Sequence, residues 1–253
     1  MIRALLMRVF ARKAIQTLPD AFELATDAGV IAVALRRNPR ARNYTLRVGG
    51  PARPPTLTIP PRGSLSGARR FLDRHSAWLE RQVARVPPPT TIAAGAVIPI
   101  RGVPHLIAHD PLRRSTAVEA GHMRPVLFVA GEATHLRRRV IDLLKREAKR
   151  DLEAAALSHA TALGVRPKQI RLRDQRTRWG SCSGEGHLSF SWRLIMAPPF
   201  VLNYLAAHEV AHLIEHNHSR RFWRLVERLC SDRHRARAWL RLEGATLHAV
   251  DAG

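Results

Sequence analysis

The sequence predicts an α+β protein, and three observations lead to this prediction. Short segments with strand-type alternation lie on both sides of a proline-rich connector at residues 87–89. A helical pattern of apolar residues runs through residues 134–163. Residues 199–214 are nearly apolar all round, which indicates a second helix that is buried on every side.

Residues 20–90 are predicted to form a β-rich N-terminal region with one helix. The apolar run at residues 30–35 and the alternating segments 44–48 and 56–59 are typical of short strands. Ser66 is placed to cap the helix that follows. The apolar side of that helix carries Phe71, Leu72, Trp78, Leu79 and Val83.

Residues 1–19 are predicted to be an N-terminal extension. Basic residues interrupt its apolar stretches, so it lacks the continuous core of a signal peptide. Its Arg-rich, acid-poor composition also fits a mitochondrial-type presequence, and Met7 is a second candidate start. No apolar run reaches the roughly 18 to 20 residues that span a bilayer. With only two cysteines in the chain, we expect a cytoplasmic protein without membrane association.

Residues 91–250 are predicted to form a second domain, which opens with strands. A hairpin is expected to turn at Gly102, and another strand covers residues 126–129. The helix over residues 134–163 then follows, and Gly164 is placed to end it in a left-handed conformation.

The second half of this domain reads as a hairpin followed by the apolar helix. A short strand at residues 169–173 precedes a hairpin whose turn is residues 184–186. Pro199 opens the apolar helix at a position where its missing N–H costs nothing. Ser219 is placed to cap one more helix.

The formal net charge of the chain is +22. A strongly basic protein attracts nucleic acid by releasing the counterions of the phosphate backbone. However, only four of the 42 basic residues are lysine, and the arginines are spread along the chain, which favours a solvated basic surface. Because the net charge alone would still attract nucleic acid, association with nucleic acid is kept as the second functional hypothesis.

The segment HEVAHLIEHNH at residues 208–218 has the pattern of a metal site. His208 and His212 are four apart on the apolar helix, so their imidazoles share one face and can bind one zinc ion. Glu209 projects to the side, where it can reach a water molecule without being a ligand. This spacing predicts two zinc ligands and one general base.

Catalytic zinc usually has a third protein ligand, and three residues compete for that role. His218 would stand about 9 Å beyond His212 on a continuous helix, so the helix must end near Ile214 for it to reach the metal. Asn217 tolerates left-handed dihedral angles, which would help the chain to turn back. His216 lies in the turn itself, and Glu227 on the next helix is the other alternative.

Further motifs resemble those of the YgjP-like zincin metallopeptidases, which are relatives of the SprT-like proteases. They are TRWGSCS at residues 177–183, LSFSWRL at residues 188–194 and NHSxxFW at residues 217–223. The likeness extends from about residue 35 to 245. Ser191 stands where the family commonly has Asn, which leaves the role of that side chain open.

The resemblance implies a zincin-like core, in which an active-site helix packs on a small sheet. It implies zinc as the cofactor, with His208, His212 and His218 as its ligands and Glu209 as the general base. The substrate would be a peptide or protein.

The hairpin before the apolar helix is the expected substrate-binding edge. Zincins often bind an extended peptide by adding it to a sheet edge, so Arg178, Trp179, Gly180, Ser181 and Cys182 are the candidate substrate-binding residues. A purely structural hairpin that packs its tryptophans on the core is the alternative. Arg178 and His187 are candidate oxyanion donors.

Taken together, these features predict a zinc-dependent metalloendopeptidase that activates water. A Cys182 nucleophile is disfavoured, because the zinc chemistry needs no thiol. Hydrolysis of a non-peptide bond, such as a nucleotide phosphoanhydride, is a further alternative, although no Gly-rich phosphate loop supports it.

Overall fold

The computed structural model describes residues 18–250, except residues 28, 52, 122 and 176. The described residues divide into two compact units, one of residues 18–49 and 53–85 and the other of residues 50–51 and 86–250. The mitochondrial presequence and the Met7 start concern residues that lie outside the described part of the chain.

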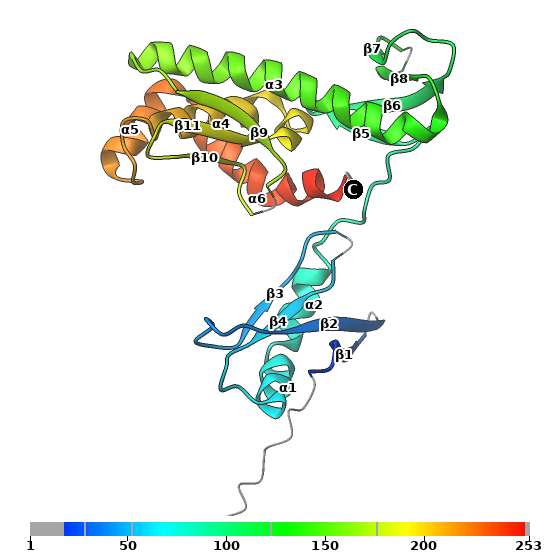
Figure 1. Cartoon of the computed structure of the whole chain (residues 1–253), viewed down its shortest axis with the longest axis vertical. Helices are drawn as coiled ribbons and strands as arrows, with labels where there is room; N and C mark the ends of the chain where they lie inside the picture. Colours follow the sequence, from blue (N-terminus) through cyan, green and yellow to red (C-terminus); the bar gives the residue numbers. More distant parts are fainter. Residues whose placement is uncertain (1–17, 28, 52, 122, 176, 251–253) are drawn as a thin grey trace, which may run out of the picture. The chain divides into compact units, whose positions relative to one another are not determined.

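The first unit is built on a mixed four-stranded sheet in the order β1-β2-β4-β3 (Figure 1). Its strands are β1 (Ala21–Thr26), β2 (Gly29–Arg37), β3 (Thr45–Arg47) and β4 (Thr56–Ile59). The three segments expected from the sequence match β2, β3 and β4, whereas β1 is additional.

Two helices follow where one was expected, α1 (Leu65–Arg74) and α2 (Ser76–Val83), with the break at His75. The prediction that Ser66 caps this helix is wrong. The cap is Ser64, two residues earlier: its hydroxyl oxygen accepts the Gly67 N–H at 3.0 Å and satisfies an otherwise unpaired helical donor. The core of this unit consists of Leu24, Val33, Leu57, Ile59, Ala68, Leu72 and Leu79.

The second unit begins with a sheet in the order β5-β6-β8-β7. Its strands are β5 (Val97–Ile100), β6 (Val103–Asp110), β7 (Ala117–Glu119) and β8 (Val126–Ala130). The β5–β6 hairpin turns at Gly102, as expected from the sequence. Its φ of 77° follows a φ of 53° at the preceding residue, which is the pattern of a tight hairpin turn.

Helix α3 (Leu136–Leu163) follows a short 3-10 turn and organises the second unit. It contacts β8, β9 and α4, and Figure 1 shows it running along this unit from one sheet to the other. Gly164 ends it with a φ of 68°, which confirms the expected left-handed stop.

The second sheet holds β9 (Gln169–Arg173), β10 (Gly180–Cys182) and β11 (His187–Ser191) in the order β10-β11-β9. Among the described residues, β10 has β11 on one side and no strand on the other. A buried 3-10 helix at Trp192–Met196 links this sheet to the remaining helices.

Three helices complete the unit: α4 (Pro199–Ala211), α5 (Arg220–Leu229) and α6 (Arg233–Ala249). Helix α4 packs against α3, β10, α5 and α6, so it is buried on all sides as its apolar sequence predicts. The fold is therefore α+β, with a buried helix packed on a small sheet. In the described part of the chain, no helix combines the length and apolar character needed to cross a membrane.

Candidate metal centre

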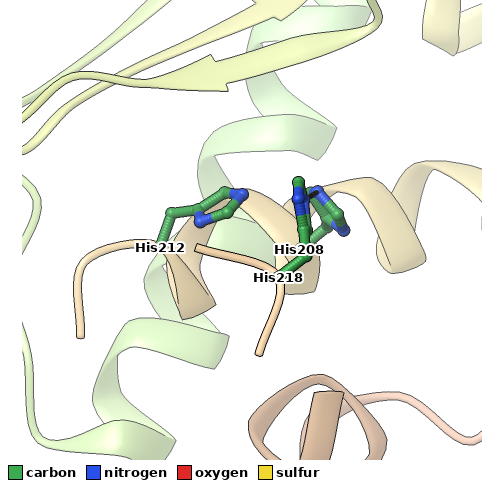
Figure 2. A group of neighbouring side chains, drawn as sticks. All are labelled: His208, His212 and His218. Carbon is green, nitrogen blue, oxygen red and sulfur yellow. Dashed lines mark hydrogen bonds between the residues drawn. The ribbon is translucent and has the colours of Figure 1, made fainter. Parts of the chain in front are cut away.

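The structure brings His208, His212 and His218 together. One ring nitrogen from each lies within 4.8 Å of the others, and Figure 2 shows the three rings turned toward a common space. The Nε2 atoms of His208 and His218 are 3.1 Å apart. Two nitrogens that bind one zinc tetrahedrally at about 2.0–2.1 Å are roughly 3.4 Å apart, so the His208–His218 pair already has nearly the spacing that zinc requires.

The chain returns to the metal site because α4 stops at Ala211. The N–H groups of Ile214 and Glu215 both donate to the Ala211 carbonyl, at 3.1 and 3.0 Å, and so close the helix with a turn. His218 then stands immediately before Ser219, whose hydroxyl caps α5 by accepting the N–H of Phe222 at 3.3 Å. The expected end of the helix before Glu215 and the Ser219 cap are both confirmed.

Asn217 helps the turn in a different way from the one expected. In the described part of the chain, Arg101 is the only non-glycine residue with a positive φ, so the left-handed Asn217 conformation is wrong. Instead, the Asn217 side-chain oxygen accepts the Ser219 N–H at 3.1 Å. This local hydrogen bond shapes the turn while the backbone keeps an ordinary conformation.

The two alternative third ligands lie outside the cluster. Within residues 18–250, apart from the four positions left undescribed, His208, His212 and His218 form the only group of His, Cys, Asp or Glu with metal-site spacing. Glu227 pairs instead with Arg233 at 3.0 Å, and His216 is exposed on the turn.

The imidazoles are held in a form that suits metal binding. His212 donates its Nδ1–H to the Glu215 carbonyl at 2.9 Å, which leaves Nε2 free for an ion. The Tyr204 hydroxyl lies 3.5 Å from Nδ1 of His208. Burial lowers the pKa of His208 to about 3 and also lowers that of His212, so both rings are neutral near neutral pH.

Phe222 forms an aromatic floor under the three histidines. Its fully buried ring lies 4.9 Å from the His208 ring, 4.4 Å from that of His212 and 4.8 Å from that of His218, between centroids. Trp223 stacks beside His218 at 5.6 Å and 23°. These contacts restrict the rotation of the imidazoles, so the site is shaped before any ion arrives.

Glu209 is buried beside the histidines, with 5% of its surface exposed. Burial raises the pKa of Glu209 to about 8, although the positive charge of Arg178 opposes the shift. Gly180 of β10 lies directly against this carboxylate: a β-carbon at Gly180 would stand 2.5 Å from Oε1. The glycine therefore allows the edge strand to approach Glu209 closely.

Gly180→Ala is expected to lower kcat/KM for peptide hydrolysis by about tenfold or more, since a displacement of about 1 Å at a reacting group can cost a hundredfold. The added methyl would push Glu209 aside without touching the histidines, so metal content should stay unchanged. Gly184→Ala is the matched control in the same hairpin, because a β-carbon there meets no atom within 4 Å. Equal kinetics in the two variants would contradict this account.

The residues of the predicted substrate edge differ in their role: Trp179 packs against α6, whereas Ser181 and Cys182 lie on the edge strand β10. Trp179 stacks on His248 of α6 at 4.5 Å, and its carbonyl accepts the Ser191 N–H at 2.8 Å. The Trp179 side chain is therefore part of the packing between the hairpin and α6. Ser181 and Cys182 pair with β11 across from Ser189 and Leu188, at the sheet edge that neighbours α4.

The other chemical candidates of the hairpin differ in their environment. Burial and the nearby Glu209 raise the pKa of the Cys182 thiol to about 11, which disfavours the thiolate that a nucleophile needs. His187 interacts with Glu185 of the turn at 3.2 Å. Arg178 is exposed and acts on Glu209 through its charge.

Sequence reasoning assigned no functional role to Tyr204 or Arg237. Tyr204 precedes His208 by four residues, and that helical spacing was the available signal for a contact between the two side chains. Arg237 lies over the Trp223 ring, with its Cζ atom 5.3 Å from the centroid. No pattern in the sequence links this arginine of α6 to a tryptophan of α5.

Comparison with known proteins gives one family. A model of the YgjP-like metallopeptidase domain matches residues 42–243. Among curated proteins, none matches significantly. A solved structure, the metallopeptidase zymogen abylysin of Pyrococcus abyssi, is 23% identical over 36% of this chain and 95% of that chain, with a TM-score of 0.32. Because the family model covers most of the chain, the protein belongs to the YgjP-like family and is a metallopeptidase.

Proposed function

We propose that the protein is a zinc-dependent metalloendopeptidase, with His208, His212 and His218 as zinc ligands and Glu209 as general base. The observation that carries the proposal is the convergence of three imidazole nitrogens beside a buried carboxylate. Three nitrogen ligands with a fourth position left to solvent are the usual set of a catalytic zinc.

The residues present fit zinc better than a harder cation. Neutral imidazoles suit zinc, whereas magnesium and calcium prefer oxygen ligands, and the cluster offers none. When bound there, zinc would supply Lewis acidity, which makes a water molecule reactive near neutral pH.

Glu209 is placed to manage the proton of the reaction. Its carboxylate accepts the proton of the attacking water, holds it in a buried position and delivers it to the leaving amine. The contact with Gly180 fixes the carboxylate beside the sheet edge, where a substrate backbone would lie.

The open edge of β10 supports a peptide as substrate. An extended chain added there would bond to the outward-facing backbone groups of Gly180 and Cys182 and pass beside Glu209. Such binding uses the substrate backbone and requires no free terminus, which is the requirement of an endopeptidase.

Removal of the metal tests this proposal. Treatment with a chelator is expected to abolish hydrolysis of a mixture of internally quenched peptides, and one equivalent of zinc per chain should restore it. Nucleotide triphosphates assayed in parallel test the phosphoanhydride alternative. Peptide hydrolysis that persists in the metal-free protein would contradict the proposal.

A further inference from the structure

Helices α5 and α6, which flank the metal site, are strongly basic. Together they carry eight arginines and two glutamates. Three of these arginines are neutralised, since Arg221 pairs with Glu215, Arg233 with Glu227 and Arg235 with Asp232. In the described structure, the arginines of these helices without a hydrogen-bond or carboxylate partner are Arg220, Arg224, Arg237 and Arg241.

Among these four arginines, Arg237 is the one that a chain of side-chain contacts connects to the histidine cluster. Its guanidinium lies over Trp223, and the Trp223 ring stacks in turn on His218. Arg237 also acts on the site electrostatically, because its positive charge helps to lower the pKa of His208 and opposes the rise that burial causes in the pKa of Tyr204. One aromatic ring therefore separates this cation from a proposed zinc ligand.

A second unpaired arginine stands at the sheet edge. Arg178 is exposed, directly precedes Trp179 and β10, and has no hydrogen-bond or carboxylate partner in the described structure. Trp179 connects this edge to α6 through its stack on His248. Two guanidinium groups without an ion-pair partner, those of Arg178 and Arg237, thus lie on elements that border the histidine cluster.

We infer that Arg237, together with Arg178, forms a subsite for a carboxylate side chain of the substrate, so that the enzyme prefers acidic peptide segments. Arginine is suited to this role because its planar donors bind a carboxylate through two parallel hydrogen bonds. The cationic rim would also attract acidic segments before they dock. The inference rests on the proposed function and names its substrate class.

The test separates binding from catalysis. A fluorescent extended peptide is prepared in a series with Glu, Gln or Lys at each of three positions on either side of the cleaved bond. Its dissociation constant is measured by anisotropy on the zinc-loaded Glu209→Gln variant, and kcat/KM is measured on the wild type. At one or more positions, the Glu peptide should bind roughly tenfold more tightly than the Gln peptide, and the Lys peptide more weakly.

Arg237→Gln, made in the same background, should bring the Glu-to-Gln ratio close to one while zinc content stays unchanged. Arg235→Gln is the matched control, because this arginine of α6 lies over Phe200 at the start of α4 and should keep the ratio. Arg178→Gln should lower the ratio partially.

Three outcomes would overturn the inference. The Glu and Gln peptides could bind equally at every position. The preference for Glu could survive in Arg237→Gln. A DNA oligonucleotide, and not the acidic peptides, could bind in a way that depends on Arg237. Binding that depends on Arg237, in a wild type that hydrolyses no peptide, would refute the proposed function and leave the subsite standing. Hydrolysis without charge preference would refute only the subsite.

Discussion

Glu209→Gln is expected to lower kcat for peptide hydrolysis by about 10²- to 10⁴-fold while the protein still binds one zinc ion. The amide has nearly the shape of the carboxylate, so the contact with Gly180 is preserved. It cannot accept the proton of the attacking water, however, and that loss affects the chemical step. Single-turnover assays beside metal analysis measure the two properties separately.

Glu185→Gln is the control for this variant, because Glu185 lies in the exposed turn of the hairpin and pairs with His187. It should keep wild-type kinetics. If Glu209→Gln turns over as fast as the wild type, Glu209 is not the general base. If the variant loses zinc, the carboxylate has a role in holding the metal.

His218→Ala is expected to weaken zinc binding by about 10²- to 10³-fold, if each histidine contributes as much as one ligand of a four-ligand zinc site whose apparent binding free energy is about 10–16 kcal/mol. The exposed position of His218 means that its removal should leave the folded core intact. Competition with a chromophoric chelator measures the affinity, and circular dichroism checks the fold.

His216→Ala and Glu227→Ala provide the matched controls for the third ligand. His216 is exposed on the turn, and Glu227 is paired with Arg233, so both variants should bind zinc as the wild type does. Loss of zinc in Glu227→Ala but not in His218→Ala would move the third ligand to α5.

The clustering of the three histidines could be predicted because it depends only on residues that are close together in the sequence. The spacing of His208 and His212 requires only a helix, and His218 requires only that this helix end before Glu215. Ser219 supplied the start of the next helix. The sequence therefore contained the three histidines that the structure brings together, the buried Glu209 beside them and the need for a turn within one short segment.

The turn itself was less accessible to sequence reasoning. Asn217 can support a turn either through its backbone or through its side chain, and the residue type does not distinguish the two. The structure uses the side-chain hydrogen bond to Ser219. Likewise serine is a favourable N-cap residue at both Ser64 and Ser66, so the residue type does not show which one caps the helix. In the structure, the Gly67 N–H donates to the Ser64 hydroxyl oxygen.

Other elements were missed because their hydrophobic pattern is weak. Strand β1 buries only Leu24, and three of the four buried residues of α6 are the small residues Ala236, Gly244 and Ala249. Such segments gain their structure from tertiary packing. The contact between Gly180 and Glu209 joins residues on different elements, so no local pattern could reveal it.

The close contact between Gly180 and Glu209 also determines which positions of this enzyme can be substituted one at a time and which cannot. The contact ties the proposed substrate-binding edge to the proposed general base, so a change in the distance between them would require simultaneous changes on β10 and α4. Exposed positions such as Arg178 and Arg237 carry no such constraint. Relatives could therefore acquire new substrate preferences by single substitutions at the rim, while the reaction geometry is inherited unchanged.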